Sequence, residues 1–85
     1  MTHTLKTWPE YFKAVKQNQK PYEVRKNDRN YQTGDTVILQ EWNPDDKKYS
    51  GEELKFLIGF VLIGPEFGIK KDYCVFGLLE HYNED

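Results

Sequence analysis

Four basic side chains lie within ten positions of the sequence around a central carboxylate, a combination suited to binding an anion. The carboxylate is Glu23, and the basic residues are Lys20, Arg25, Lys26 and Arg29. Arginine presents a planar fork of N–H donors and lysine a compact ammonium group, and both bind phosphate and carboxylate groups. The other interpretation is a set of ordinary cross-strand ion pairs, each worth roughly 0.2 to 1 kcal/mol. The residue types alone leave both interpretations open.

A short strand would position this cluster. Residues 22–26 read Y-E-V-R-K, and successive side chains of an extended chain point to opposite faces. Tyr22 and Val24 would therefore share one face, and Glu23 and Arg25 would share the other. We expect the apolar pair to pack against the core and the charged pair to point outward, where a ligand can reach it.

The length of 85 residues predicts one domain spanning residues 1–85, because two cores of half that size would be too small to be stable. Only 38% of the residues are hydrophobic, but thirteen are aromatic, and each buried ring removes about 150 to 250 Å² from water. The net charge of −2 argues against unspecific coating of nucleic acid. Residues 1–30 nevertheless carry a net charge of +4 and residues 31–85 one of −6, which favours a partner bound at one basic place.

The sequence predicts neither a metal nor a cofactor. Cys74 is the single cysteine, so it cannot form an internal disulfide, and we expect it to act as a small core hydrophobe. His3 has no second ligand at metal spacing, and His81 belongs to a polar tail expected to contact solvent. A glycine-rich phosphate loop and a serine nucleophile elbow are absent. Without a signal-peptide pattern or a long apolar run, we expect a cytoplasmic protein that does not associate with membranes.

A helix is predicted to follow the first strand. Residues 7–10, T-W-P-E, have the form of a capping box in which Thr7 would cap the amide of Glu10. Asn18 tolerates a left-handed conformation and Pro21 prevents continuation, so the helix should end near residue 18. Four apolar residues at i, i+3, i+4 and i+7 predict a single packed stripe, made of Trp8, Tyr11, Phe12 and Val15.

Besides residues 22–26, four segments rich in β-branched and apolar residues are predicted to be strands: Thr2–Lys6, Thr36–Trp42, Leu54–Ile63 and Tyr73–Leu79. Gly59 is expected to mark a bulge or bend inside its strand. Asp45 and Asp46 lack the spacing of a calcium loop and are expected at an exposed hairpin tip. The pattern predicts a small α+β barrel with one early helix rather than a parallel α/β sheet.

Several motifs together resemble the ASCH superfamily, and within it a short branch of unknown function found in bacteria and phages. They are L-K-T-W-P-E-Y-F-x-A-V (residues 5–15), K-x-x-E-x-R (20–25), K-N-D-R (26–29) and G-D (34–35). The segments Q-E-W (40–42) and Y-S-G-E-E-L (49–54) and the closing strand extend the resemblance over nearly the whole chain. The resemblance implies a PUA-like β-barrel of about five to six strands with a helix after the first strand. It also implies a cleft between helix and barrel that binds RNA.

The superfamily motif G-x-K-x-x-E-x-R has Asn18 at its glycine position here. The resemblance implies that Lys20 and Arg25 bind a phosphate or a base edge, and that Glu23 accepts a hydrogen bond from a base amino group. A base would stack on an exposed ring, with Trp8 as the first candidate and Tyr31 and Trp42 as weaker ones. The residues expected to bind the ligand are Lys6, Trp8, Lys20, Glu23, Arg25, Lys26 and Arg29.

Some ASCH proteins of similar size are amidohydrolases of acetylated cytidine that use a Lys, a Thr and a Glu in the cleft. Lys20 matches the lysine, but Glu23 stands at the threonine position, so the hydroxyl nucleophile is missing and we name no catalytic residue. We therefore expect an RNA-binding or nucleotide-binding module. The alternatives are a small amidohydrolase acting on a modified nucleoside, with Lys20 and Glu23 in acid/base roles, and a protein-interaction module of phage origin.

Overall fold

The structure is a computed structural model, and it describes residues 1–80. The predicted polar tail, His81 to Asp85, lies outside the described residues. The elements, in chain order, are β1 (Thr2–Thr7), α1 (Pro9–Lys16), β2 (Tyr22–Lys26), β3 (Thr36–Asn43), β4 (Lys48–Ile63), a short 3-10 helix η1 (Glu66–Gly68) and β5 (Tyr73–Glu80). The five predicted strands and the predicted helix are therefore all confirmed, and the predicted segment Leu54–Ile63 forms the second part of β4.

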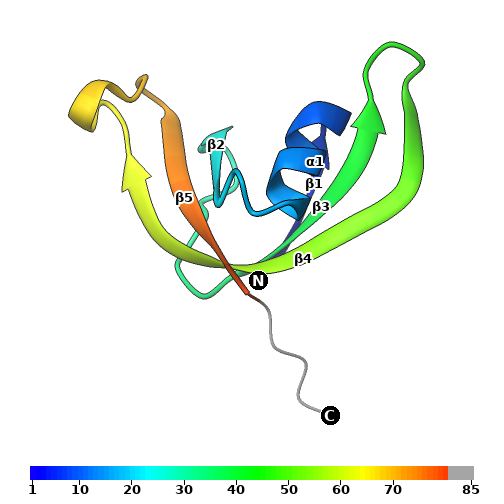
Figure 1. Ribbon diagram of the computed structural model, residues 1–85. Coiled ribbons are helices and arrows are strands. Elements are labelled where there is room, and N and C mark those ends of the chain that lie inside the picture. The colour runs from blue at the N-terminus through cyan, green and yellow to red at the C-terminus, as the bar shows by residue number, and fades with distance from the viewer. Residues whose placement is uncertain (81–85) are drawn as a thin grey trace.

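The five strands form one mixed sheet in the order β1-β3-β4-β5-β2. β1 pairs in parallel with β3, and the other neighbours are antiparallel. Figure 1 shows the sheet curled into a half-barrel, with β4 running through its middle and α1 lying in the concave side. The β4–β5 register shifts between Ile58 and Val61, which confirms the bulge predicted at Gly59.

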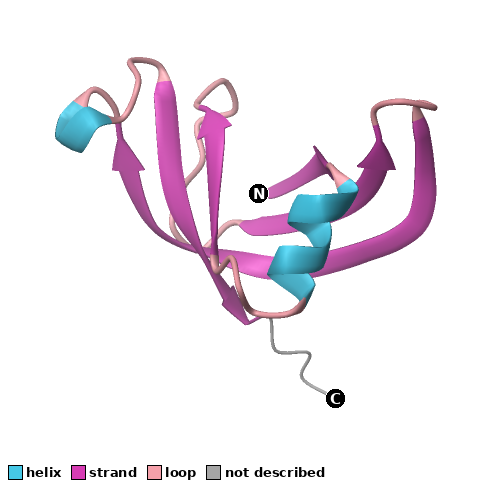
Figure 2. Ribbon diagram, turned by 45° about the horizontal axis from the view of Figure 1, so that its top comes forward, coloured by secondary structure: helices cyan, strands magenta, loops and turns pink. Residues whose placement is uncertain are grey.

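The sheet is open between its two edge strands, so the predicted β-barrel is present only as a half-barrel. Two arginine side chains lie where β1 and β2 would otherwise pair. The Nη2 group of Arg25 donates to the Lys6 carbonyl at 2.9 Å, and Nη1 of Arg29 donates to the Thr4 carbonyl at 3.0 Å. These bonds pair backbone acceptors at the free edge of β1, which no neighbouring strand covers. Figure 2 shows this gap facing α1.

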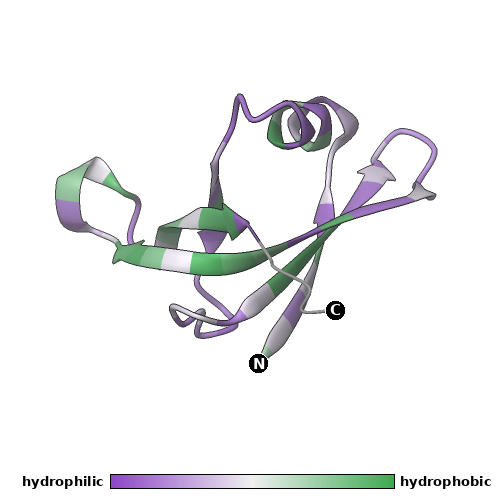
Figure 3. Ribbon diagram, turned by 60° about the horizontal axis from the view of Figure 1, so that its bottom comes forward, coloured by the Kyte–Doolittle hydropathy of each residue, from purple (hydrophilic) through white to green (hydrophobic). Residues whose placement is uncertain are grey.

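The core fills the concave side of the sheet. Its buried hydrophobic residues are Leu5, Phe12, Val15, Tyr31, Val37, Leu39, Ile58, Cys74 and Phe76. Cys74 is fully buried, as predicted, and burial raises the pKa of its thiol. Figure 3 shows that hydrophobic segments lie along the second half of β4, whereas the β3–β4 hairpin, which includes Asp45 and Asp46, is hydrophilic.

The start of α1 differs from the predicted capping box. Trp8 is the N-cap residue, and no side chain caps the helix. Thr7 is instead the last residue of β1, where its buried hydroxyl accepts a hydrogen bond from Arg25 at 3.3 Å. The predicted apolar stripe also divides, because Phe12 and Val15 enter the core while the two aromatic residues nearer the N-terminus remain half exposed. The end of the helix is as expected, with Asn18 in the left-handed region at φ 60°.

The two faces of β2 are the reverse of the prediction. Glu23 is buried, with 3% of its surface exposed, whereas Tyr22 and Val24 are 45% and 52% exposed. The alternation of side chains was correct, but the assumption that the apolar pair faces inward was wrong. Burial of a carboxylate is tolerated when cations and hydrogen bonds compensate it, and Glu23 has both.

His3 makes structural contacts inside the folded protein. Its ring lies in the core against Tyr31, at 4.8 Å between ring centroids, and Nε2 lies 2.8 Å from Oδ2 of Asp35. The hydrogen bond from His3, aided by the Gln32 amide and the N-terminus, holds the pKa of Asp35 below its usual value of 3.8. The carboxylate form of Asp35 therefore stabilises the folded protein.

This arrangement predicts a pH dependence of stability. Because the pKa of Asp35 is lower in the folded state, its contribution is present above about pH 4 and is lost as the pH falls through the folded value. We expect Asp35→Asn to cost about 1 to 3 kcal/mol at pH 6 and less at pH 3, measured by urea unfolding at both pH values. A cost that is the same at both pH values would contradict this role.

Candidate ligand-binding pocket

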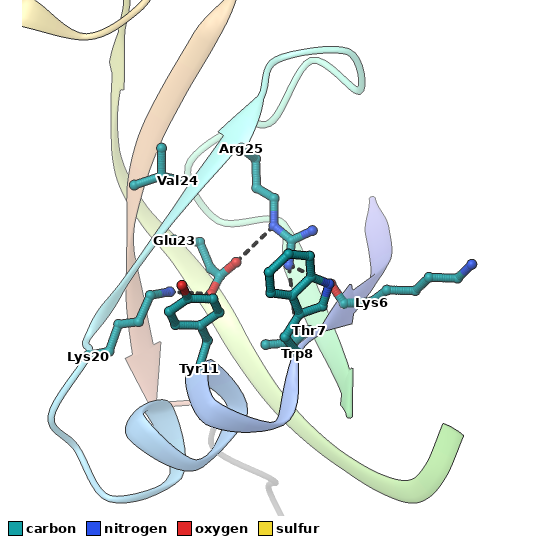
Figure 4. Close-up of a pocket in the computed structure, with 8 residues that line it drawn as sticks. All are labelled: Lys6, Thr7, Trp8, Tyr11, Lys20, Glu23, Val24 and Arg25. Atoms are coloured by element: carbon teal, nitrogen blue, oxygen red, sulfur yellow. Dashed lines mark hydrogen bonds and ion pairs between the residues drawn. The ribbon is translucent and has the colours of Figure 1, made fainter. Parts of the chain in front are cut away.

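A pocket of about 310 Å³ opens between the start of α1, the end of β1 and β2. This volume is at the lower end of the range for small-molecule sites and suits a single flat ring better than a large ligand. Figure 4 shows the residues that line it, which are Lys6, Thr7, Trp8, Tyr11, Lys20, Glu23, Val24 and Arg25. All of them come from the first 25 residues of the chain, within the part whose net charge is +4.

The end of α1 positions Lys20. After Asn18 turns the chain, the amides of Gln19 and Lys20 both donate to the Ala14 carbonyl, at 2.8 and 3.2 Å. These bonds hold the residues after the helix close to its last turn. The Lys20 ammonium donates to the Tyr22 carbonyl at 2.8 Å and so lies over the start of β2.

Glu23 joins the two principal cations of the pocket. Lys20 Nζ lies 2.6 Å from Oε1 of Glu23, and Arg25 Nε lies 2.8 Å from Oε2. The carboxylate is almost fully covered, with 4% of its side chain exposed, whereas the side chains of Lys20 and Arg25 are 18% and 25% exposed. The pocket therefore presents the cations to a ligand and hides the carboxylate. Glu23 is placed to orient both cations rather than to contact a base.

Arg25 is fixed at three of its five N–H groups. Besides Glu23, its guanidinium contacts the Lys6 carbonyl and the Thr7 hydroxyl through Nη2. Such a planar fork loses little further freedom when it binds a ligand. Arg25 thus links β2 to the end of β1 and also forms part of the pocket wall (Figure 4).

Two aromatic rings form another wall of the pocket. The rings of Trp8 and Tyr11 lie nearly parallel, at 25° and 6.1 Å between centroids. They are 49% and 45% exposed, although both belong to the apolar stripe of α1. Exposed aromatic faces next to cations are typical of surfaces on which nucleobases stack. Trp8 is therefore available for stacking, whereas Tyr31 is buried in the core.

The other predicted ligand-binding residues are divided between the pocket and its surroundings. Lys6 lines the pocket, with its ammonium 4.5 Å from the centroid of the Trp42 ring. Arg29 does not line this pocket but lies, with Arg25, in the wall of a neighbouring cavity of about 440 Å³. Lys26 follows Arg25 on β2, pairs with Tyr73 of β5 and does not line the pocket. The structure thus brings five of the seven predicted residues together.

Sequence reasoning missed Thr7, Tyr11 and Val24 as pocket residues. Tyr11 lies one helical turn after Trp8, so this spacing could have identified it once Trp8 was taken as a wall of the pocket. Thr7 was assigned to a helix cap, and its place beside Arg25 depends on the approach of β2 to β1. No local sequence signal reports that approach.

Metal ligands do not gather in the described part of the chain, where no three His, Cys, Asp or Glu side chains are grouped to hold an ion. Within residues 1–80, the helices are also too short and too polar to cross a membrane.

The family model of a domain of unknown function, DUF3850, matches residues 2–78. The chain belongs to this family. The matched DUF3850 residues include every residue that lines the pocket. The chain is also similar to an uncharacterized 12.9 kDa protein in the GpA 3′ region of Escherichia phage P2, with 50% identity over 40 residues. Those residues make up 47% of this DUF3850 chain and 37% of the phage protein.

Proposed function

We propose that the pocket between α1, β1 and β2 binds a nucleotide of single-stranded RNA. The observation that carries this proposal is the position of two partly exposed cations, anchored by a buried carboxylate, next to two half-exposed and nearly parallel aromatic rings. A flat ring could stack on Trp8 or Tyr11 while Lys20 and Arg25 contact its edge. Lys6 and Arg29, outside this contact, are available to the phosphate backbone.

The resemblance to the ASCH superfamily supports the same proposal. The half-barrel with a helix after β1 is compatible with a PUA-like fold, and the pocket lies between helix and sheet, where the resemblance implies a cleft. Lys20, Glu23 and Arg25 occupy the positions of the superfamily motif K-x-x-E-x-R.

A binding measurement tests the proposal. We expect a fluorescently labelled, unstructured single-stranded RNA pool to bind with an affinity that falls as salt rises, measured by fluorescence anisotropy. Lys6→Ala and Lys20→Ala should both weaken binding, and loss of the phosphate-contacting Lys6 should also reduce the magnitude of the salt slope by about one. Lys6 is exposed and contacts the Trp42 ring, so its loss should change the free energy of unfolding by at most about 1 kcal/mol, whereas Lys20→Ala leaves Glu23 with one cation fewer.

Lys13→Ala is the matched control, because Lys13 is an exposed lysine on α1, close in the chain to Lys6 and Lys20, and does not line the pocket. Equal affinity of wild type, Lys6→Ala and Lys20→Ala for the RNA pool would contradict the proposed site. Salt-insensitive capture of a protein partner, resistant to nuclease, would instead favour an interaction module.

One observation favours a second candidate, hydrolysis of an acylated nucleoside. Thr7 supplies a hydroxyl to the same pocket as Lys20 and Glu23, although it comes from β1 rather than from the position that the resemblance implies. Its hydroxyl accepts from Arg25, and Lys20 donates to two oxygens, so neither group is arranged as a base for the other. Incubation with acetylated cytidine followed by chromatography tests this candidate, and absence of turnover at high protein concentration would eliminate it.

A further inference from the structure

The hydrogen-bond acceptors of the charged cluster are already occupied. Lys20 donates to the Tyr22 carbonyl and to Oε1 of Glu23, at 2.8 and 2.6 Å. Arg25 donates to Oε2 of Glu23, to the Lys6 carbonyl and to the Thr7 hydroxyl, at 2.8, 2.9 and 3.3 Å. Glu23 and Thr7 are also buried, so their side-chain oxygens are poorly accessible to a ligand.

Donors remain. A lysine ammonium has three N–H groups and an arginine guanidinium five. Two of the three on Lys20 and three of the five on Arg25 have partners among the described residues, which leaves one N–H on Lys20 and both N–H groups of Arg25 Nη1. Tyr11 adds a hydroxyl that can donate or accept. The charged side of the pocket therefore offers donors to whatever enters it.

The rings of Trp8 and Tyr11 favour a ligand whose hydrogen-bond acceptors belong to a flat ring. A phosphate group would satisfy the donors but would leave the exposed rings of Trp8 and Tyr11 without a partner. A nucleobase that stacks on either ring would present its edge to Lys20 and Arg25. Guanine offers the acceptors O6 and N7, and uracil offers O4, whereas adenine and cytosine place an amino donor at the equivalent position. An amino group there would face N–H donors and lose its hydrogen bond.

We propose that the pocket selects keto bases, guanine and uracil, over the amino bases adenine and cytosine. This inference rests on the proposed function, because it specifies which nucleotides that site accepts. Specificity comes from Glu23 indirectly, since this residue occupies and orients the donors without contacting the base. Trp8 and Tyr11 contribute affinity but little discrimination, because every base has a face that can stack.

Two matched pairs of nucleotides test the inference on the wild-type protein. Inosine monophosphate and adenosine monophosphate differ by a carbonyl or an amino group at position 6, and uridine and cytidine monophosphate differ in the same way at position 4. We expect isothermal titration calorimetry to give about tenfold tighter binding for the keto member of each pair. Tyr11→Phe, which keeps the ring and removes the hydroxyl, should retain the preference.

The outcomes separate this inference from the proposed function. Equal binding of all four nucleotides, weakened by Lys6→Ala, would show that the phosphate rather than the base edge is recognised, which overturns the keto preference and leaves nucleotide binding intact. A preference for the amino members would overturn it as well. Absence of binding by all four nucleotides and by the RNA pool would remove the proposed function and this inference together.

Discussion

Replacement of Glu23 with glutamine is expected to lower the free energy of unfolding by about 2 to 4 kcal/mol. The amide oxygen of glutamine can accept from one cation, but its NH₂ group would then face the N–H groups of the other. Removal of one partner from a buried ion pair typically costs about 3 to 5 kcal/mol. The lower value expected here reflects the partial exposure of Lys20 and Arg25, which lets water replace part of the lost contact.

Urea unfolding measures this cost, and Glu52→Gln is the matched control. Glu52 accepts from Lys16 at 3.1 Å in a pair whose side chains are 55% and 57% exposed. An exposed pair of this kind contributes about 0 to 1 kcal/mol, so the control should be close to wild type. Equal costs for the two substitutions would show that Glu23 is not the anchor of the pocket.

Replacement of Trp8 with alanine is expected to weaken RNA binding about tenfold or more while changing the free energy of unfolding by less than about 1 kcal/mol. Stacking of a base on an aromatic side chain contributes about 1 to 3 kcal/mol. The side chain of Trp8 is half exposed, so its removal leaves no buried cavity. Trp8→Phe, which keeps an aromatic face, should recover most of the affinity.

Phe12→Ala is the comparison for this prediction, because Phe12 lies one turn along the same apolar stripe but is buried in the core. Its removal should destabilise the protein by about 3 to 5 kcal/mol. Anisotropy and urea unfolding on both variants separate a ligand-binding role from a packing role. If Trp8→Ala unfolded as easily as Phe12→Ala, or bound RNA as well as wild type, the aromatic wall would not be part of a binding site.

The comparison between sequence and structure shows which inferences local patterns support. The strands, the helix and the bulge at Gly59 follow from residue type and spacing, and each is present. The period of alternation in β2 was also correct. The predicted orientation of that strand was wrong, because alternation places Glu23 and Arg25 on one face but does not show which face is buried. Burial of the carboxylate is tolerable because Arg25 and Lys20, which approaches from the preceding turn, both pair with it.

Long-range contacts account for the other differences. The Thr7 hydroxyl satisfies Arg25, eighteen residues away in the chain, rather than the start of its own helix. The open edge between β1 and β2 depends on the bonds from Arg25 and Arg29 to carbonyls of β1. These contacts join segments that are distant in the sequence, and local residue patterns do not show that such segments lie close together in the fold. The family match over residues 2–78 identifies the domain but assigns it no chemistry, so the pocket itself carries the functional argument.

The most direct test of the account is to map where an unstructured single-stranded RNA contacts the protein, using chemical-shift changes in nuclear magnetic resonance spectra of isotope-labelled protein. We predict that the Trp8 indole N–H and the amides of residues 6–11 and 20–25 shift on titration, in proportion to the RNA bound. The exposed apolar residues Phe60 and Leu79 on β4 and β5 provide the reference surface. Shifts confined to that surface, with the pocket resonances unchanged, would contradict the account.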